Sequence, residues 1–220
     1  MVTDRPPGSG KSLSQFRQSE ELTSIELPSN PKLVDLAQVI ESVMKEGSRA
    51  EVRSACAEFL NSAAAFYNVK APEVRALSAR PLRVREGGWQ IELFGDYALK
   101  DALIRIWTRT AVRKQVTSFG TFLSTLCHEF CHHLDCQKFG FVRSPHTRGF
   151  YERAGLLYHH ARGTPVKKLF WAQLPGGRWR IDWARTNSVQ RTADQILSFS
   201  SRSYSGKRPS DQDGRPERST

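Results

Sequence analysis

The most informative segment of the chain reads Leu126-Cys127-His128-Glu129-Phe130-Cys131-His132-His133-Leu134-Asp135 and contains the pattern H-E-x-x-H. Positions four apart on a helix lie one turn apart on the same face, so the imidazoles of His128 and His132 can reach one ion. Glu129 is next to this pair and is placed to act as a general base on a water that the ion activates. The pattern predicts a catalytic zinc site with one Zn²⁺ per chain.

The residues around this pattern predict a helix over about residues 117–136. Its apolar side chains fall within an arc of about 120° at about 100° per residue, and they are Phe119, Phe122, Leu123, Leu126, Phe130 and Leu134. His128 and His132 fall on the opposite side, which is typical of a helix that forms the floor of a cleft. His133 is nearer the edge of the apolar face and is interpreted as structural.

A catalytic zinc ion usually has three protein ligands and a water, so a third ligand is needed. A histidine six residues after His132 is excluded, because that position is Lys138. A helix is predicted over about residues 147–161, and His146 at its start continues the face that packs inward. His146 is therefore the preferred third ligand, and Glu152, about 200° from Phe150 on the helix, is the alternative.

Further polar groups near the motif have open roles. Asp135, three residues after His132, is expected either to orient that imidazole from behind or to form a surface ion pair. Tyr151, Tyr158 and Arg148 are candidates for stabilising an oxyanion, and the sequence does not select among them.

Three cysteines lie in or next to the motif: Cys127, Cys131 and Cys136. Cys127 and Cys131 share a helix face, and thiolates bind zinc well. A structural zinc site built from cysteine normally uses two separate close pairs, and the sequence has no second pair. The three cysteines are therefore interpreted as small packing residues.

The chain has 220 residues, of which 39% are hydrophobic and 25% are charged, and this length fits one ordinary domain with extensions. Residues 1–28 and 201–220 have no apolar periodicity, so both are expected to be disordered tails of a single domain over residues 29–200. The segment Gly8-Ser9-Gly10-Lys11-Ser12 is not a phosphate-binding loop, because the position of the required first glycine holds Arg5.

Periodicity and turn residues predict an α+β fold. The expected elements are, in order, helices over 30–47 and 48–67, two or three strands between 72 and 110 that end with 103–109, helices over 117–136 and 147–161, and a late hairpin of 169–174 with 178–184. Ser48 and Glu51 form a capping-box pattern at the second helix. The strands are expected to form a small, mainly antiparallel sheet along the cleft, and the strand that ends near Arg109 is the candidate edge for pairing with an extended peptide.

The net charge is +11, and residues 31–200 carry +10 of it. Such a charge favours anionic partners such as nucleic acid. No apolar run of about 18 residues exists, and residues 1–21 contain no stretch of signal-peptide type, so we expect no membrane partner and a cytoplasmic location. Four cysteines in a chain of this length fit a reducing compartment.

An alternative function is nucleic-acid binding with a structural or vestigial metal site. It is supported by the basic cluster Arg105, Arg109, Arg113 and Lys114 and by the alternation of arginine and tryptophan over residues 178–183. Trp179, Ile181 and Trp183 are expected on one face of that strand, which is equally typical of a half-buried core strand. The sequence gives no indication of the oligomeric state.

Residues 102–160 resemble the SprT-like, or Spartan-related, family of zinc metallopeptidases. The resemblance consists of a strand, the helix with His128, Glu129 and His132, and a later His146 followed by Gly149-Phe150. It implies a zincin fold, a zinc-dependent endopeptidase with a protein or peptide substrate, and a histidine as third ligand. Some members act on proteins attached to DNA. In the family a glycine generally follows the third ligand, whereas Thr147 follows it here, and the four-cysteine zinc ribbon of many members has no counterpart in this sequence.

Overall fold

The helix predicted around H-E-x-x-H is α4 (Phe119–Gln137) in the computed structural model, which describes residues 1–84, 90–142 and 146–188. Ser118 caps its first turn by accepting a hydrogen bond from the Thr121 N–H. The predicted apolar stripe faces the core, where Phe122, Leu123, Leu126, Phe130 and Leu134 are buried. Helix α5 (Arg148–Arg162) packs along α4.

The two helices predicted before the sheet are confirmed as α2 (Lys32–Glu46) and α3 (Arg49–Tyr67). The capping box is present, because Ser48 accepts from the Glu51 N–H while Glu51 accepts from the Ser48 N–H. Helix α2 packs against α3 and α5, and α3 packs on the sheet. Their buried faces join those of α4 and the sheet in one core.

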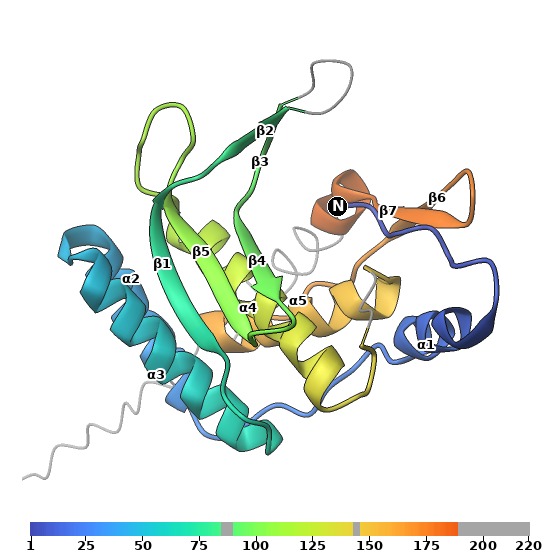
Figure 1. Cartoon of the computed structure of the whole chain (residues 1–220), viewed down its shortest axis with the longest axis horizontal. Helices are drawn as coiled ribbons and strands as arrows, with labels where there is room; N and C mark the ends of the chain where they lie inside the picture. Colours follow the sequence, from blue (N-terminus) through green and yellow to red (C-terminus); the bar gives the residue numbers. More distant parts are fainter. Residues whose placement is uncertain (85–89, 143–145, 189–220) are drawn as a thin grey trace, which may run out of the picture.

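The central sheet has three strands in the order β1 (Glu73–Ala79), β5 (Leu103–Arg109) and β4 (Gly95–Ala98), as Figure 1 shows. Ile104 and Ile106 are fully buried against the helices, whereas the alternate side chains of β5 face outward. Helix α3 covers β1, and α4 covers β4 and β5.

Two expectations about this sheet are corrected. It is mixed and not mainly antiparallel, because β5 runs antiparallel to β4 but parallel to β1. The chain leaves β1 through a separate hairpin, β2 (Leu82–Val84) with β3 (Gln90–Glu92), returns along β4, and then turns into the gap between β4 and β1. The strand that ends at Arg109 is therefore central, and the edge strand beside α4 is β4. Apolar alternation indicates which face of a strand is buried but not which strands are its neighbours.

The expected disorder of residues 1–28 is not what the structure shows. Helix α1 (Gly10–Glu21) lies in this segment and packs on α5, with Phe16 and Ser19 buried. Before α1, the chain runs alongside the late hairpin, where Val2 forms an antiparallel bridge with Arg180 (Figure 1). The segment gains its order from contacts with residues far along the sequence, which local composition does not reveal.

The late hairpin is confirmed as β6 (Trp171–Leu174) and β7 (Arg178–Ile181). Ile181 is buried, but Trp183 lies beyond the strand and is 43% exposed, so the expected apolar face does not extend to it. The predicted tail over residues 201–220 lies outside the described residues. Among the described helices, none combines the length and the apolar character that crossing a membrane requires.

Candidate metal centre

Three imidazoles converge at one point on the face of α4 that is turned away from the core. His128 and His132 come from successive turns of α4, and His146 comes from the segment just before α5. Their Nε2 atoms are 3.2 Å apart between His128 and His132, and His146 is 3.1 Å from each of the other two. The structure thus brings together the three histidines that the sequence analysis selected.

The ring of Phe150 packs against all three imidazoles. This fully buried ring is stacked on His132 at a centroid distance of 4.3 Å and meets His128 and His146 edge-on at 4.8 and 5.2 Å. Because one rigid ring contacts all three imidazoles, their relative positions are restrained by packing as well as by the backbone.

The spacing of the three nitrogens fits a bound cation. A ring nitrogen of a neutral imidazole either donates or accepts a hydrogen bond, so three mutually adjacent nitrogens cannot all be paired donor to acceptor. Three lone pairs directed at one ion remove this conflict. In a tetrahedral zinc site with Zn–N distances of about 2.0–2.1 Å, ligand nitrogens are about 3.3–3.4 Å apart, close to the separations observed here.

Burial keeps the imidazoles of α4 in the form that binds metal. Desolvation, with a smaller contribution from His146, lowers the pKa of His128 to about 3. The pKa of His132 is also held well below its usual value, chiefly by desolvation. Both side chains are therefore neutral at pH 7 and have lone pairs available without losing a proton first.

Asp4 is a residue of the candidate site that the sequence analysis missed. Its Oδ2 accepts a hydrogen bond from the backbone N–H of His146 at 2.9 Å and lies 3.3 Å from Nδ1 of the same residue. The His146 carbonyl in turn accepts from the Asp4 N–H at 2.8 Å. A carboxylate on Nδ1 fixes the tautomer that leaves Nε2 unprotonated, and ligand histidines in metal sites commonly have such a partner. The hydrogen bonds with His146 lower the pKa of Asp4.

Glu129 is 6% exposed and lies between α4 and β4. The close approach of β4 requires Gly95, because a Cβ there would lie 2.6 Å from Thr125 and 3.1 Å from Cγ of Glu129. Burial raises the pKa of Glu129 to about 8, and the nearby Asp96 contributes to the increase. A carboxyl group with a pKa close to neutrality is suited to exchanging protons at pH 7.

The cluster opens into a groove of about 1010 Å³. One wall is the segment from Glu92 to Tyr97, which includes most of β4. The floor is formed by α4, with Glu129, His128 and His132, and by His146 from the segment before α5. Tyr151 and Tyr158, two of the three oxyanion candidates, line the groove. The hydroxyl of Tyr151 donates to the Val2 carbonyl at 3.1 Å, and its ring stacks on His146.

Two other candidates have structural partners. Arg148 pairs with Glu20 and lies over the ring of Trp179, and it is not among the residues that line the groove. Glu152, the alternative third ligand, accepts a hydrogen bond from Nε1 of Trp171 and is not part of the histidine cluster. The structure thus favours His146 over Glu152 as the third member of the site.

Asp135 forms an ion pair with Arg153, whose Nη2 is 2.8 and 2.7 Å from the two carboxylate oxygens. The expectation of a surface pair is wrong, because both side chains are fully buried. Arg153 also donates to the backbone carbonyls of Ser19 and Leu22, so it links α4, α5 and the end of α1.

The remaining residues of the motif have packing roles. Nε2 of His133 is 2.8 Å from the Lys70 carbonyl, so it carries the proton, and Nδ1 accepts from the hydroxyl of Tyr97 at 3.0 Å. This confirms the structural interpretation of His133. Cys127 and Cys131 are fully buried, and Cys136 is half-buried beside the Phe141 carbonyl.

Comparison of the chain with protein-family models, with curated proteins and with solved structures found no match. The candidate site consists of three convergent imidazoles, a carboxylate behind one of them, and a buried glutamate in the same groove.

Proposed function

We propose that the chain is a zinc-dependent metalloendopeptidase of the SprT-like, zincin type. His128, His132 and His146 hold one Zn²⁺, and Glu129 is the general base. The observation that carries the proposal is the convergence of the three Nε2 atoms in an open groove that also contains Glu129. A structural zinc site normally has four protein ligands, whereas three ligands beside an open groove leave one position for water or substrate.

The donor set favours zinc among the common metals. Three imidazole nitrogens suit zinc, while calcium and magnesium require oxygen ligands. When bound, the ion would lower the pKa of a coordinated water towards about 7 and polarise the carbonyl of the peptide bond.

The protein residues perform the remaining steps. Glu129 takes a proton from the attacking water and passes it to the amine that leaves. Its position in the same groove as the three histidines supports this role. Tyr151 and Tyr158 remain the candidates for stabilising the oxyanion, since both line the groove. The hydroxyl of Tyr151 would first have to leave the Val2 carbonyl, to which it donates.

The groove suits an extended peptide. Strand β4 pairs with β5 on one side, and in the described part of the chain no other strand pairs with it. Residues of β4 form a wall of the groove opposite the histidines. A peptide that adds to this edge would be held by main-chain hydrogen bonds with its backbone across the cluster.

The first prediction concerns Glu129→Gln. We expect this variant to retain one zinc ion per chain and to lose hydrolysis of an unfolded protein substrate by about 10²-fold to 10⁴-fold, because the amide cannot accept the proton. Metal analysis and cleavage of a fluorogenic protein are the measurements. Glu152→Gln is the matched control and keeps its activity, since Glu152 lies outside the cluster. Wild-type cleavage by Glu129→Gln would show that another group is the base.

A specific observation supports nucleic-acid binding as a second candidate function. The outward face of the sheet carries Arg105, Trp107 and Arg109 on β5, with the exposed Arg75 opposite Arg105 on β1. An aromatic ring between cations is suited to a nucleic-acid strand. Arg105 is, however, already paired with both carboxylate oxygens of Asp96.

The salt dependence of DNA affinity tests this second candidate. If the sheet face contacts phosphates, replacing Arg75 and Arg109 by glutamine lowers the slope of log K against log salt by about 2, roughly one unit per lost contact. The matched control replaces Arg49 and Arg53, two exposed arginines on α3. An equal change in both double variants would indicate only a general effect of net charge.

A further inference from the structure

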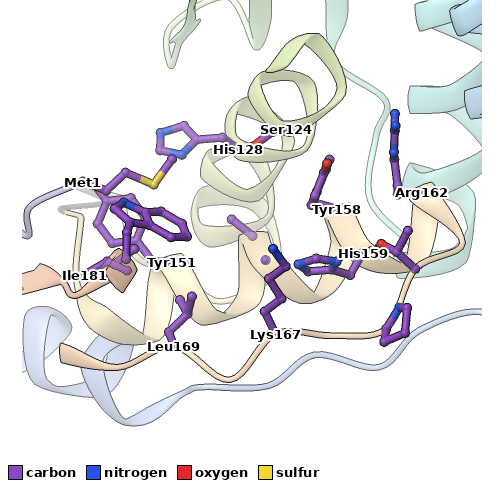
Figure 2. Close-up of a pocket in the computed structure, with 15 residues that line it drawn as sticks. Met1, Ser124, His128, Tyr151, Tyr158, His159, Arg162, Lys167, Leu169 and Ile181 are labelled. Atoms are coloured by element: carbon purple, nitrogen blue, oxygen red, sulfur yellow. Dashed lines mark hydrogen bonds between the residues drawn. The ribbon is translucent and has the colours of Figure 1, made fainter. Parts of the chain in front are cut away.

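A second cavity, of about 440 Å³, shares His128 with the groove. It runs along α5, between that helix and the chain that follows it from Thr164 to Trp183 (Figure 2). Five residues line both the cavity and the groove: Met1, Ser124, His128, Tyr151 and Tyr158. The two spaces therefore meet at the metal centre, and a chain that crosses the centre could continue into the cavity.

Small residues of α5 create the room. Ala154 and Gly155 line the cavity, and a Cβ added at Gly155 would have no atom within 4 Å. The facing wall is apolar, with Leu169, Ile181 and the half-exposed Trp183. The near part of the cavity is thus shaped for apolar side chains or the carbon stem of a longer one.

The far part of the cavity is basic. Arg162 and Lys167 line it, and none of the residues known to line the cavity is an aspartate or glutamate. Figure 2 shows Lys167 midway along the cavity and Arg162 at the end away from His128. His159 lies nearby, and burial lowers its pKa, so it adds no charge at pH 7.

Arg162 has an incompletely satisfied guanidinium group. Its Nη1 is buried and has no hydrogen-bond partner in the part of the chain that the structure describes. The group lies over the ring of Phe119, 4.7 Å from the centroid, which fixes its position without using its donors. A buried donor without a partner is unfavourable, and a carboxylate is the acceptor that a guanidinium binds best.

The length of the cavity determines how far from the scissile bond an acidic side chain of a bound peptide would lie. Tyr151 and Arg162 are eleven residues apart on α5, which corresponds to about 16 Å along the helix axis. An extended peptide advances about 3.3 Å per residue, and a glutamate side chain spans part of the remaining distance. An acidic residue two to four positions from the bond would therefore place its carboxylate near Lys167 or Arg162.

We propose that this cavity binds the substrate on one side of the scissile bond and selects acidic segments, with apolar residues next to the bond and an aspartate or glutamate two to four positions away. The inference rests on the proposed peptidase function and adds a substrate class to it. A nucleic-acid strand fits less well, because the near part of the cavity is apolar and narrow compared with an open basic surface.

The test uses a series of peptides with one cleavage site and with Glu, Gln or Lys placed at each of four positions on either side. We expect kcat/KM to be about tenfold or more higher for Glu than for Lys, on one side only, because the gain is that of a charge-assisted hydrogen bond. Replacing Arg162 and Lys167 together by glutamine removes this preference. Lys168→Gln is the matched control, since Lys168 is exposed and does not line the cavity.

Gly155→Leu tests the cavity without changing its charge. The leucine side chain occupies the near part of the cavity, and the substitution favours the helix, so the variant is expected to fold. It should lower kcat/KM for every peptide that extends into the cavity and affect much less those peptides that have only one residue beyond the bond on that side. Unchanged cleavage of all peptides would overturn the proposal, as would a preference for Glu that persists without Arg162 and Lys167.

Binding to zinc-loaded Glu129→Gln protein separates this proposal from the peptidase function. If the zinc-loaded wild-type protein cleaves no peptide, but the variant binds the acidic peptide more tightly than its lysine counterpart and loses this advantage without Arg162 and Lys167, the cavity assignment stands and the peptidase function fails. Equal binding of both peptides overturns the cavity assignment. Displacement of the acidic peptide by a short single-stranded DNA, dependent on the same two residues, would assign the cavity to nucleic acid instead.

Discussion

Asp4 and His146 are held together by a reciprocal pair of hydrogen bonds and by the carboxylate beside Nδ1. Asp4, near the beginning of the chain, therefore holds both the backbone and the side chain of His146 in place. The sequence suggested His146 through its place before a helix, but it could not suggest Asp4. A contact across 142 residues leaves no local pattern, and a lone aspartate among polar residues has no distinguishing feature.

Asp4→Ala should weaken zinc binding about 10-fold to 100-fold, which is the usual effect of removing a hydrogen-bond partner from a ligand histidine. Asp4→Asn should lie between this variant and the wild type, because its carbonyl oxygen still accepts a hydrogen bond but has no charge. Competition with a chromophoric chelator measures the affinity. Asp35→Ala, at an exposed position of α2, is the control. Equal affinity in Asp4→Ala and the wild type would contradict the assigned role of Asp4.

At the scale of elements, the predictable parts are those whose signal is local. The apolar stripe of α4, the capping box of α3 and the Pro175-Gly176-Gly177 turn of the hairpin each lie within a few residues, and each structure formed as expected. The position of β5 at the centre of the sheet and the docking of α1 depend on partners elsewhere in the chain. Burial pattern and composition carry no information about these partners, so both were predicted wrongly.

The docking of α1 on α5 depends on Gly149, because a Cβ there would collide with the Ser19 carbonyl oxygen. We expect Gly149→Ala to release α1 and to lower the free energy of unfolding. Gly155→Ala, on the same helix but facing open space, should instead raise it by about 0.5–1 kcal/mol. Denaturant unfolding and limited proteolysis before Leu22 measure the two effects. Equal stability of the two variants would show that α1 does not depend on this contact.

At the scale of the whole molecule, the metal centre joins three parts of the chain. Two of the proposed ligands lie on α4, the third precedes α5, and its partner Asp4 comes from the segment that runs along β7. A ligand that binds only the folded state stabilises it by mass action. Zinc should therefore act on the stability of the entire fold and not only on catalysis.

Thermal unfolding with and without zinc tests this coupling. At a free zinc concentration 100 times the dissociation constant, the expected stabilisation is about 2.7 kcal/mol. His146→Ala should remove most of it at the same zinc concentration. His160→Ala, which changes a histidine of α5 outside the cluster, should leave it intact. A zinc effect that survives in His146→Ala would place the ion elsewhere.

The unequal burial of the four cysteines has a practical consequence. Cys56, Cys127 and Cys131 are buried, whereas Cys136 is half-buried and lines the groove beside the histidines. A thiol-reactive dye should therefore label the native protein at one position, next to where a peptide would lie. Burial raises the pKa of Cys136 to about 11, so labelling will require alkaline buffer. The sequence thus supplies a single attachment point, Cys136, for a dye that reports groove occupancy.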